Sequence, residues 1–366
     1  MKRILVTGSL GYIGSVLTDY LGERGFDCVG YDTGFFRHAQ LYPPAPTNTV
    51  LCDARDLNDA DIKAADVVVH LAGMSNDPLG KLDAASVYDP TREYSRAIAG
   101  VCKRYGVRFI FASSCSVYGL GDTELLTEAS ATHPQTPYSL NKLQIEDDLR
   151  AMSDGSFSPI ALRLATVFGP SPRIRFDVVV NMLTGMAVSN GMIVLNSDGR
   201  AWRPNVHILD ACQAVRLAID VEYRGGELLV LNVGDEVNNL QVIEIAGIVQ
   251  QAVPGCRLRF LTDDPGLDKE GLIRDRKIRD GGDTRTYRVS FEKIRSALLG
   301  FSCDWTVARG VKDMAERLAG LGFTPAVFKR RGFYRLQELE HLHEHGYLSD
   351  DLRWLQPRPD SHTESR

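Results

Sequence analysis

A tyrosine and a lysine four residues apart, Tyr138 and Lys142, are the side chains in this sequence best suited to proton transfer. Residues four apart on a helix share a face, so the ammonium group would lie beside the phenol. A phenol has a pKa near 10 and is a poor base at neutral pH unless a neighbouring cation lowers that pKa. Such a pair alone would be expected on a solvated helix surface, so its interpretation depends on the surrounding sequence.

Serines stand directly after a predicted strand upstream of this pair. The apolar run 108–112 is followed by Ser113-Ser114-Cys115-Ser116-Val117-Tyr118-Gly119. In open α/β sheets, ligands bind beyond the carboxyl ends of the strands. A serine at that place could polarise a substrate hydroxyl or carbonyl group beside the tyrosine. Serine, tyrosine and lysine in this order would catalyse hydride transfer if a nicotinamide cofactor lay beside them.

A dinucleotide-binding signal stands in residues 2–14. An apolar run, glycines at positions 8, 11 and 14, and an apolar-periodic segment give the order strand, turn, helix. Gly8 would permit the tight turn, Gly11 the close approach of a pyrophosphate, and Gly14 close packing of the helix. Asp32 ends the next apolar run, where an acid binds a ribose 2′-hydroxyl and repels a 2′-phosphate. We therefore expect NAD rather than NADP; the alternative is a glycine-rich turn in an unrelated α/β protein.

The composition is that of a globular protein. Of the 366 residues, 44% are hydrophobic and 24% are charged. A net charge of −5 argues against a nucleic-acid-binding surface, and no apolar run reaches the length of a membrane span. The seven cysteines are scattered without a CxxC pair, and no signal-peptide pattern is present. These features predict a cytoplasmic protein with free thiols.

Strand and helix patterns alternate through the first half of the chain. Strands are predicted at residues 3–7, 28–31, 49–52, 66–73, 108–112 and 159–164. Long helical patterns lie between them, at 84–105 and from Pro137 onward. This alternation predicts an α/β fold with a doubly wound parallel sheet of the Rossmann type.

We expect three parts in the chain. Residues 1–169 would form the NAD-binding domain with the serine, tyrosine and lysine, and 170–320 a smaller C-terminal α/β lobe for substrate. Residues 321–366 would be an extension with an amphipathic helix at 333–345 and a disordered tail from Gln356. Within the lobe, we predict helices at 176–189, 208–221, 240–253, 291–299 and 307–319, a strand at 228–231, and a long charged surface loop at 263–283.

In combination, these segments resemble the extended short-chain dehydrogenases/reductases, whose best-known members are nucleotide-sugar epimerases and dehydratases. The resemblance rests on TGxxGxxG at 7–14, Asp32, HLAG at 70–73, Ser113-Ser114 with Tyr118-Gly119, YxxxK at 138–142 and RL…FGP at 163–170. In the second half, segments at 203–210, 231–234 and 282–294 are similar to the family's substrate lobe. The resemblance covers about residues 3–320 and leaves the extension uncovered.

The resemblance implies a role for each matching residue. Tyr138 would be the catalytic base and acid, Lys142 the cation that lowers its pKa and binds a ribose, and Ser114 the catalytic serine. The implied NAD-binding residues are Gly8, Gly11, Tyr12, Ile13, Gly14, Asp32, Asp53, Ala54, Leu71, Ala72, Gly73, Tyr138 and Lys142. The implied substrate-binding residues are Ser114, Ser116, Asn181, Arg203 and Arg285, the two arginines holding the diphosphate.

The function implied is an NAD-dependent nucleotide-sugar epimerase that acts at carbon 4 through a 4-keto intermediate. Dehydratases of the family carry Asp-Glu directly after the serine or threonine, where this chain has Cys115 and Ser116. Alternatives are a 4-ketoreductase or dehydrogenase, a 4,6-dehydratase, and a non-catalytic NAD-binding sensor, although sensors typically lose the tyrosine or lysine. The expected partners are a nucleotide-diphosphate sugar and a second copy in a homodimer. We expect no metal, because His341, His343 and His345 lack a completing cluster, and His70 is expected to pack within a strand.

Overall fold

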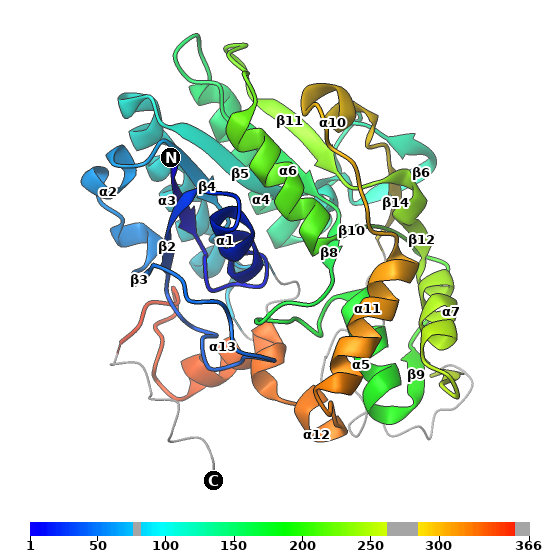
Figure 1. Ribbon diagram of the computed structural model, residues 1–366. Coiled ribbons are helices and arrows are strands. Elements are labelled where there is room, and N and C mark those ends of the chain that lie inside the picture. Colours follow the sequence, from blue (N-terminus) through cyan, green and yellow to red (C-terminus); the bar gives the residue numbers. More distant parts are fainter. Residues whose placement is uncertain (76–81, 262–284, 356–366) are drawn as a thin grey trace.

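A parallel sheet of seven strands forms the centre of the protein in a computed structural model, which describes residues 1–75, 82–261 and 285–355 (Figure 1). The strand order is β11-β7-β5-β4-β1-β2-β3, and every neighbouring pair is parallel. This topology confirms the doubly wound, Rossmann-type sheet. The strands are β1 (Arg3–Thr7), β2 (Asp27–Asp32), β3 (Thr49–Leu51), β4 (Val67–His70), β5 (Arg108–Ser114), β7 (Ile160–Leu164) and β11 (Leu229–Val233).

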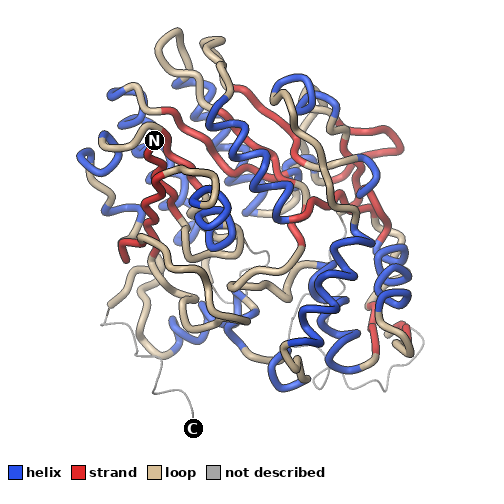
Figure 2. The backbone as a smooth tube through the Cα atoms, in the orientation of Figure 1, coloured by secondary structure: helices blue, strands red, loops and turns tan. Residues whose placement is uncertain are grey.

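Helices cover both faces of this sheet (Figures 1 and 2). On one face lie α1 (Gly14–Gly22) and α6 (Ile208–Asp220); on the other lie α2 (Asp59–Lys63), α3 (Ala84–Tyr105) and α4 (Pro137–Met152). Alternate residues of a strand enter opposite cores, so Ile4 and Val6 pack in one cluster and Leu5 packs in the other. Because both faces are buried, the central strands read as nearly continuous apolar runs in the sequence.

The strand order reverses at β1, which lies between β2 and β4. In open α/β sheets, the crevice at this switch point is where ligands bind. The turn after β1 needs its glycines: Gly8 has φ +75°, and a Cβ atom on Gly14 would lie 2.1 Å from the Gly8 carbonyl oxygen. Helix α1 therefore begins in direct contact with the turn, as the glycine spacing predicted.

A smaller group of short strands and helices, most of them from the second half of the chain, lies beside the central sheet (Figure 1). Three small sheets pair β12-β10-β8, β13-β9 and β14-β6. Their strands are β6 (Leu120–Leu126), β8 (Thr166–Phe168), β9 (Met192–Leu195), β10 (Trp202–His207), β12 (Asn239–Gln241), β13 (Arg257–Phe260) and β14 (Thr286–Val289). The helices are α5 (Val179–Asn190), α7 (Val242–Ala252), α10 (Glu292–Ala297) and α11 (Val307–Gly320). The helices of this region were therefore predicted correctly. None of these seven short strands was predicted.

Strand β11 links the two halves of the chain. It lies within the range assigned to the smaller lobe, yet it pairs with β7 in the central sheet, Leu231 opposite Leu162. The central sheet therefore takes strands from both sides of residue 169. The division into three parts stays a prediction.

The C-terminal extension folds back toward the first half of the chain. It contains α12 (Pro325–Phe328) and α13 (Arg335–Glu344), the second of which confirms the predicted amphipathic helix. Leu339, Leu342, Leu348 and Leu352 pack in one cluster with Phe35 from the segment after β2. The predicted loop at 263–283 and the predicted tail from Gln356 lie outside the described residues. The described residues also form four 3₁₀ helices, Ala54–Asp56, Cys115–Tyr118, Glu236–Asn238 and Arg331–Phe333.

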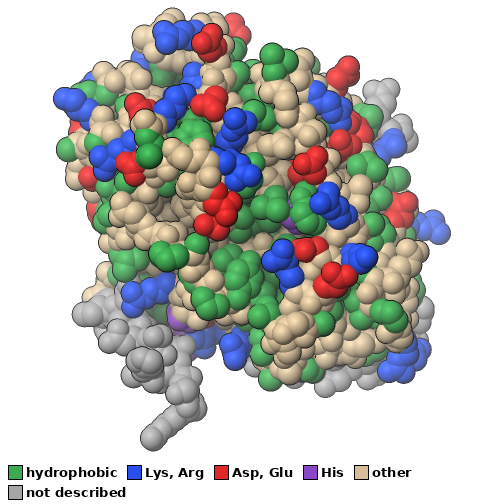
Figure 3. Space-filling model, viewed as in Figure 1, with side chains coloured by type: hydrophobic (Ala, Val, Ile, Leu, Met, Phe, Trp, Pro, Cys, Tyr) green, Lys and Arg blue, Asp and Glu red, His purple; other side chains and the backbone are tan. Residues whose placement is uncertain are grey.

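Charged side chains of both signs are interspersed on the face of the molecule seen in Figure 3. Among the described residues, every helix is too short or too polar to span a bilayer.

Candidate active site

A cavity of about 700 Å³ opens at the carboxyl ends of the central strands, within the size range of small-molecule sites. The structure brings together here every site residue predicted from the sequence except Asn181. Those residues are Gly8, Gly11, Tyr12, Ile13, Gly14, Asp32, Asp53, Ala54, Leu71, Ala72, Gly73, Ser114, Ser116, Tyr138, Lys142, Arg203 and Arg285.

One end of the cavity is formed by the glycine turn and the segments after β2 and β3. Helix α1 begins there at Gly14 without a side-chain cap, so its first amide groups and positive dipole end are available to an anion. The Asp32 carboxylate accepts hydrogen bonds from the backbone N–H of Leu10 at 3.0 Å and of Gly34 at 2.6 Å. These bonds fix the carboxylate beside the turn. A tight glycine cradle, an uncapped helix terminus and a fixed acid fit a dinucleotide.

Lys142 and Tyr138 lie in the first turns of α4. The helix begins at Pro137 because the Thr136 side chain caps it, accepting from the Ser139 N–H at 3.2 Å. Lys142 Nζ lies 5.8 Å from the centre of the Tyr138 ring and donates to the Ala112 carbonyl at 2.8 Å. Burial lowers the pKa of Lys142 to about 8, although Glu146 acts in the opposite direction. The ammonium group is therefore held beside the phenol, as the spacing suggested.

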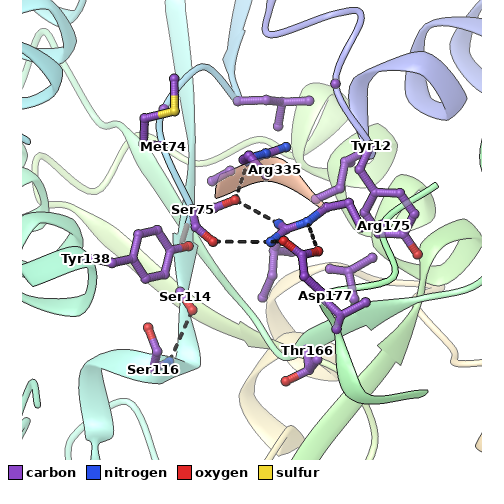
Figure 4. A pocket seen from close by; sticks show the side chains of 18 of the residues that line it. Tyr12, Met74, Ser75, Ser114, Ser116, Tyr138, Thr166, Arg175, Asp177 and Arg335 are labelled. Atoms are coloured by element: carbon purple, nitrogen blue, oxygen red, sulfur yellow. Dashed lines mark hydrogen bonds and ion pairs between the residues drawn. The ribbon is translucent and has the colours of Figure 1, made fainter. Parts of the chain in front are cut away.

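Ser114 ends β5 on the same side of the cavity as Tyr138, together with Ser116 (Figure 4). Ser114 Oγ accepts from the Ser116 N–H at 3.1 Å. The Ser116 hydroxyl is buried and has no hydrogen-bond partner among the described residues. Cys115 between them donates to the Arg163 carbonyl at 3.2 Å, and burial raises the pKa of its thiol. Cys115 is therefore a neutral, buried thiol, whereas Ser116 can bond a ligand.

A buried polar network joins the elements that carry Ser114, Tyr138 and Lys142. Arg163 on β7 forms an ion pair with Glu146 on α4 at 2.7 Å, and Glu146 also accepts from Ser113 Oγ at 2.5 Å. Arg163 donates to the Tyr118 hydroxyl at 2.9 Å, which in turn donates to Asn232 on β11 at 2.8 Å. The network fixes the end of β5 relative to the helix that carries Tyr138 and Lys142.

Two arginines from the second half line the cavity. Arg203, on β10, is mostly buried, and its Nη1 donates to the Trp202 carbonyl at 2.9 Å and to the Arg285 carbonyl. Arg285 immediately precedes β14 and lines the same cavity. Two segments about 80 residues apart thus place guanidinium groups where an anionic ligand could bind.

Asn181 is not part of this arrangement. It is fully buried on α5, where its amide donates to the Tyr12 hydroxyl at 3.1 Å and to the Arg175 carbonyl at 3.0 Å. Its carbonyl oxygen accepts from the Gly169 N–H at 2.9 Å. Its side chain is bonded inside the protein and does not line the cavity, so the structure does not bring Asn181 together with the other predicted substrate-binding residues.

Sequence reasoning missed four residues that line the cavity or its approach. Arg175 pairs with Asp177 at 2.8 Å and donates to Ser75 Oγ at 2.8 Å. Arg335, from the C-terminal extension, also donates to Ser75 Oγ. Three separate segments meet here, so no spacing reveals the group. The two arginines in the loop after β8, Arg173 and Arg175, were the available signal.

His70 lies in β4, as expected, with both ring nitrogens bonded. Nδ1 contacts Thr7 Oγ1 at 2.8 Å and Nε2 contacts Ser95 Oγ at 2.9 Å. Burial lowers its pKa to about 3, so the ring is neutral. Across the described ranges, no three histidine, cysteine or acidic side chains are grouped as metal ligands.

The fold and the cavity agree with comparisons to known proteins. The model of the NAD dependent epimerase/dehydratase family matches residues 4–234, and the chain belongs to this family. It is therefore an enzyme whose cofactor is NAD, of the epimerase or dehydratase type.

Relatives include both types. A UDP-glucose 4-epimerase of Azospirillum brasilense is 28% identical over 251 residues, which are 63% of this chain and 72% of the relative. A dTDP-glucose 4,6-dehydratase of Xanthomonas campestris pv. campestris is 24% identical over 250 residues, 65% of this chain and 70% of the relative. The solved structure of MoeE5 in complex with UDP-glucuronic acid and NAD is similar with a TM-score of 0.70 and 25% identity, covering 87% of this chain and 99% of that one.

Proposed function

We propose that this protein is an NAD-dependent nucleotide-sugar epimerase that inverts carbon 4 through a 4-keto intermediate. The observation that supports this choice over a dehydratase is the chemistry directly after Ser114. Positions 115 and 116 hold a buried neutral thiol and a hydroxyl group, with no carboxyl group at either. Removing water requires a further acid and base, whereas epimerisation requires only one group that removes and returns a proton.

Tyr138 is the proposed base and acid. It removes the proton of the carbon-4 hydroxyl and returns it after the sugar has turned its other face toward the cofactor. The bound NAD supplies the reversible oxidation of carbon 4. Lys142 beside Tyr138 stabilises the phenolate, and Ser114 donates a hydrogen bond to the oxygen as it becomes a carbonyl.

The cofactor and substrate would occupy different parts of the cavity. The glycine turn, α1 and Asp32 bind the dinucleotide, with Asp53 and Ala54 at its adenine. Arg203 and Arg285 bind the diphosphate of the sugar nucleotide by charge-assisted hydrogen bonds. The UDP-glucose 4-epimerase among the relatives and the UDP-glucuronic acid in MoeE5 support a nucleotide-diphosphate sugar as substrate.

An epimerase must keep its reduced cofactor between the two half-reactions. We therefore expect NAD to copurify with the protein, detected by mass spectrometry after denaturation. We also expect turnover of the correct sugar nucleotide without consumption of added NADH. Stoichiometric consumption of added NADH would favour the ketoreductase instead.

We further propose a cytoplasmic homodimer, on family analogy. The helices at the dimer interface would be α3 and α4, which pack against each other within one subunit. Leu140 on α4 is an exposed hydrophobic residue there. Sedimentation velocity of the purified protein tests this: a single species of monomer mass would contradict the dimer.

A further inference from the structure

The C-terminal extension lines the same cavity as the family's nucleotide-binding residues. Arg335, at the start of α13, contributes to the cavity, and so do Asp351 and Leu352. The family match ends at residue 234, so it assigns no role to any of these residues. A ligand in this cavity would therefore contact the extension as well.

Arg335 is a buried cation whose charge is incompletely matched. Only 9% of the residue is exposed, and its Nε has no hydrogen-bond partner among the described residues. Its guanidinium donates to Ser75 Oγ and lies 5.3 Å from the centre of the Phe36 ring. No ion pair joins it to a carboxylate of the described ranges. Burial lowers its pKa to about 9, and the nearby Arg175 acts in the same direction. Burying a charge in this way is costly unless an anion completes the site.

The position of Arg335 indicates which anion this would be. The charges that act on Arg335 include that of Asp177, which is itself paired with Arg175 at 2.8 Å. They also include those of Tyr138, at the proposed nicotinamide ribose, and Asp32, at the proposed adenosine ribose. Figure 4 shows Arg335 between Tyr138 and Tyr12 of the glycine turn. In a dinucleotide, the pyrophosphate is the group that joins the two riboses. A cation that lies between the two ribose sites and near the glycine turn is therefore placed for the pyrophosphate.

The rest of the extension is anchored at the adenosine end of the cavity. Arg55 bonds Asp53 at 2.6 Å and Asp351 at 2.9 Å, which ties the extension to the segment after β3. The Trp354 indole donates to the Thr33 carbonyl at 2.9 Å, directly after β2. These contacts fix the part of the extension that follows α13 against the predicted cofactor-binding loops.

We propose that Arg335 binds the pyrophosphate of NAD, so that the C-terminal extension is a working part of the cofactor site. This inference rests on the proposed course of the cofactor along the cavity. It adds a contact from a segment that the family match does not include. The extension would then help to retain the cofactor during turnover.

Calorimetric titration of the cofactor-free protein tests this proposal. The variants are Arg335→Gln, Arg335→Lys, which keeps the charge but loses the planar fork, and Arg330→Ala, an exposed arginine of the same extension, as the control. The ligands are NAD, ADP-ribose, which has the pyrophosphate but no nicotinamide, and adenosine, which has no phosphate. Far-ultraviolet circular dichroism establishes that each variant is folded; if the Gln variant is not, the Lys variant decides.

We expect Arg335→Gln to weaken NAD and ADP-ribose by the same factor, about tenfold or more, as for a hydrogen bond to a charged group. Arg335→Lys should be intermediate, and Arg330→Ala and all adenosine affinities should match wild type. Unchanged NAD affinity, or an equal loss for adenosine, would overturn the proposal. These binding results do not depend on the epimerase assay, so the proposal for Arg335 and the proposed function can fail independently of each other.

Discussion

At the scale of single residues, the catalytic end of the cavity depends on the charge of one buried lysine. Lys142 donates to a backbone carbonyl from a position with little solvent, and burial lowers its pKa to about 8. Near neutral pH it is still largely protonated, so it can stabilise the phenolate of Tyr138. The sequence could predict this pair because the residue types and their spacing carry the chemistry directly. It could not predict Arg335, whose role depends on a fold that brings position 335 beside position 75.

Replacing Tyr138 by Phe should remove the proposed acid and base while keeping the ring that packs in the cavity. Turnover should fall by about 10²–10⁴-fold, the usual contribution of positioned acid–base catalysis, with the fold and bound cofactor unchanged. Ser114→Ala should lose less. Steady-state rates and the copurified cofactor content measure both effects; a fully active Phe variant would refute the mechanism.

Changing Arg203 or Arg285 to Ala should weaken binding of the sugar nucleotide by about 1.5–3 kcal/mol, the scale of a hydrogen bond to a charged group. NAD affinity should hardly change, because both arginines lie outside the proposed cofactor residues. Titration with substrate and with NAD compares the two sites. Normal substrate affinity in both variants would show that the diphosphate binds elsewhere.

The buried Lys142 should also give the cofactor-free protein a characteristic pH dependence. Its pKa is 10.5 in the unfolded chain and about 8 when folded, so between these values the unfolded state binds more protons. The contribution of Lys142 to stability therefore rises with pH in this window and is least favourable below it. Relative to wild type, Lys142→Met should be most stabilised at about pH 7 and progressively less so toward about pH 10. Denaturant unfolding at both pH values measures the difference; a pH-independent difference would contradict the buried, shifted lysine.

At the scale of elements, the position of α4 relative to the sheet is set by the ion pair between Glu146 and Arg163. The strand and helix patterns predicted both elements, because buried parallel strands and amphipathic helices leave strong periodic signals. They did not predict that β11 would join the central sheet beside β7. A short apolar run looks the same in either sheet, and the choice depends on pairing across about 70 residues. The short strands of the second half escaped prediction for the same reason.

Glu146→Gln should destabilise the protein strongly, by about 3–5 kcal/mol, because it leaves Arg163 buried without a counter-charge. Asp147→Asn is a matched control on the next residue, since its partner Arg150 and Asp147 itself are both exposed. Chemical denaturation gives the free energies of unfolding. Similar small losses in both variants would mean that the buried pair does not hold α4 in place.

At the scale of the whole molecule, three stretches distant in sequence contribute to one cavity. The first half supplies the glycine turn and the proposed catalytic residues. Strand β10 and the segment before β14 supply two arginines, and the extension supplies Arg335. The sequence indicated the first two contributions because their motifs are local. The third contribution has no such local motif, because it arises from contacts of the extension with the segments after β2 and β3. The complete site therefore exists only in the folded chain.

The central claim, epimerisation at carbon 4, is tested most directly by the product formed in deuterated water. The purified enzyme is incubated with UDP-, GDP-, CDP-, ADP- and dTDP-sugars, and each product is examined by mass spectrometry and nuclear magnetic resonance. We predict a stereoisomer at carbon 4 with unchanged mass and no deuterium on carbon. Deuterium at carbon 5, or a product lighter by one water, would contradict the account and identify a dehydratase that uses a different acid and base.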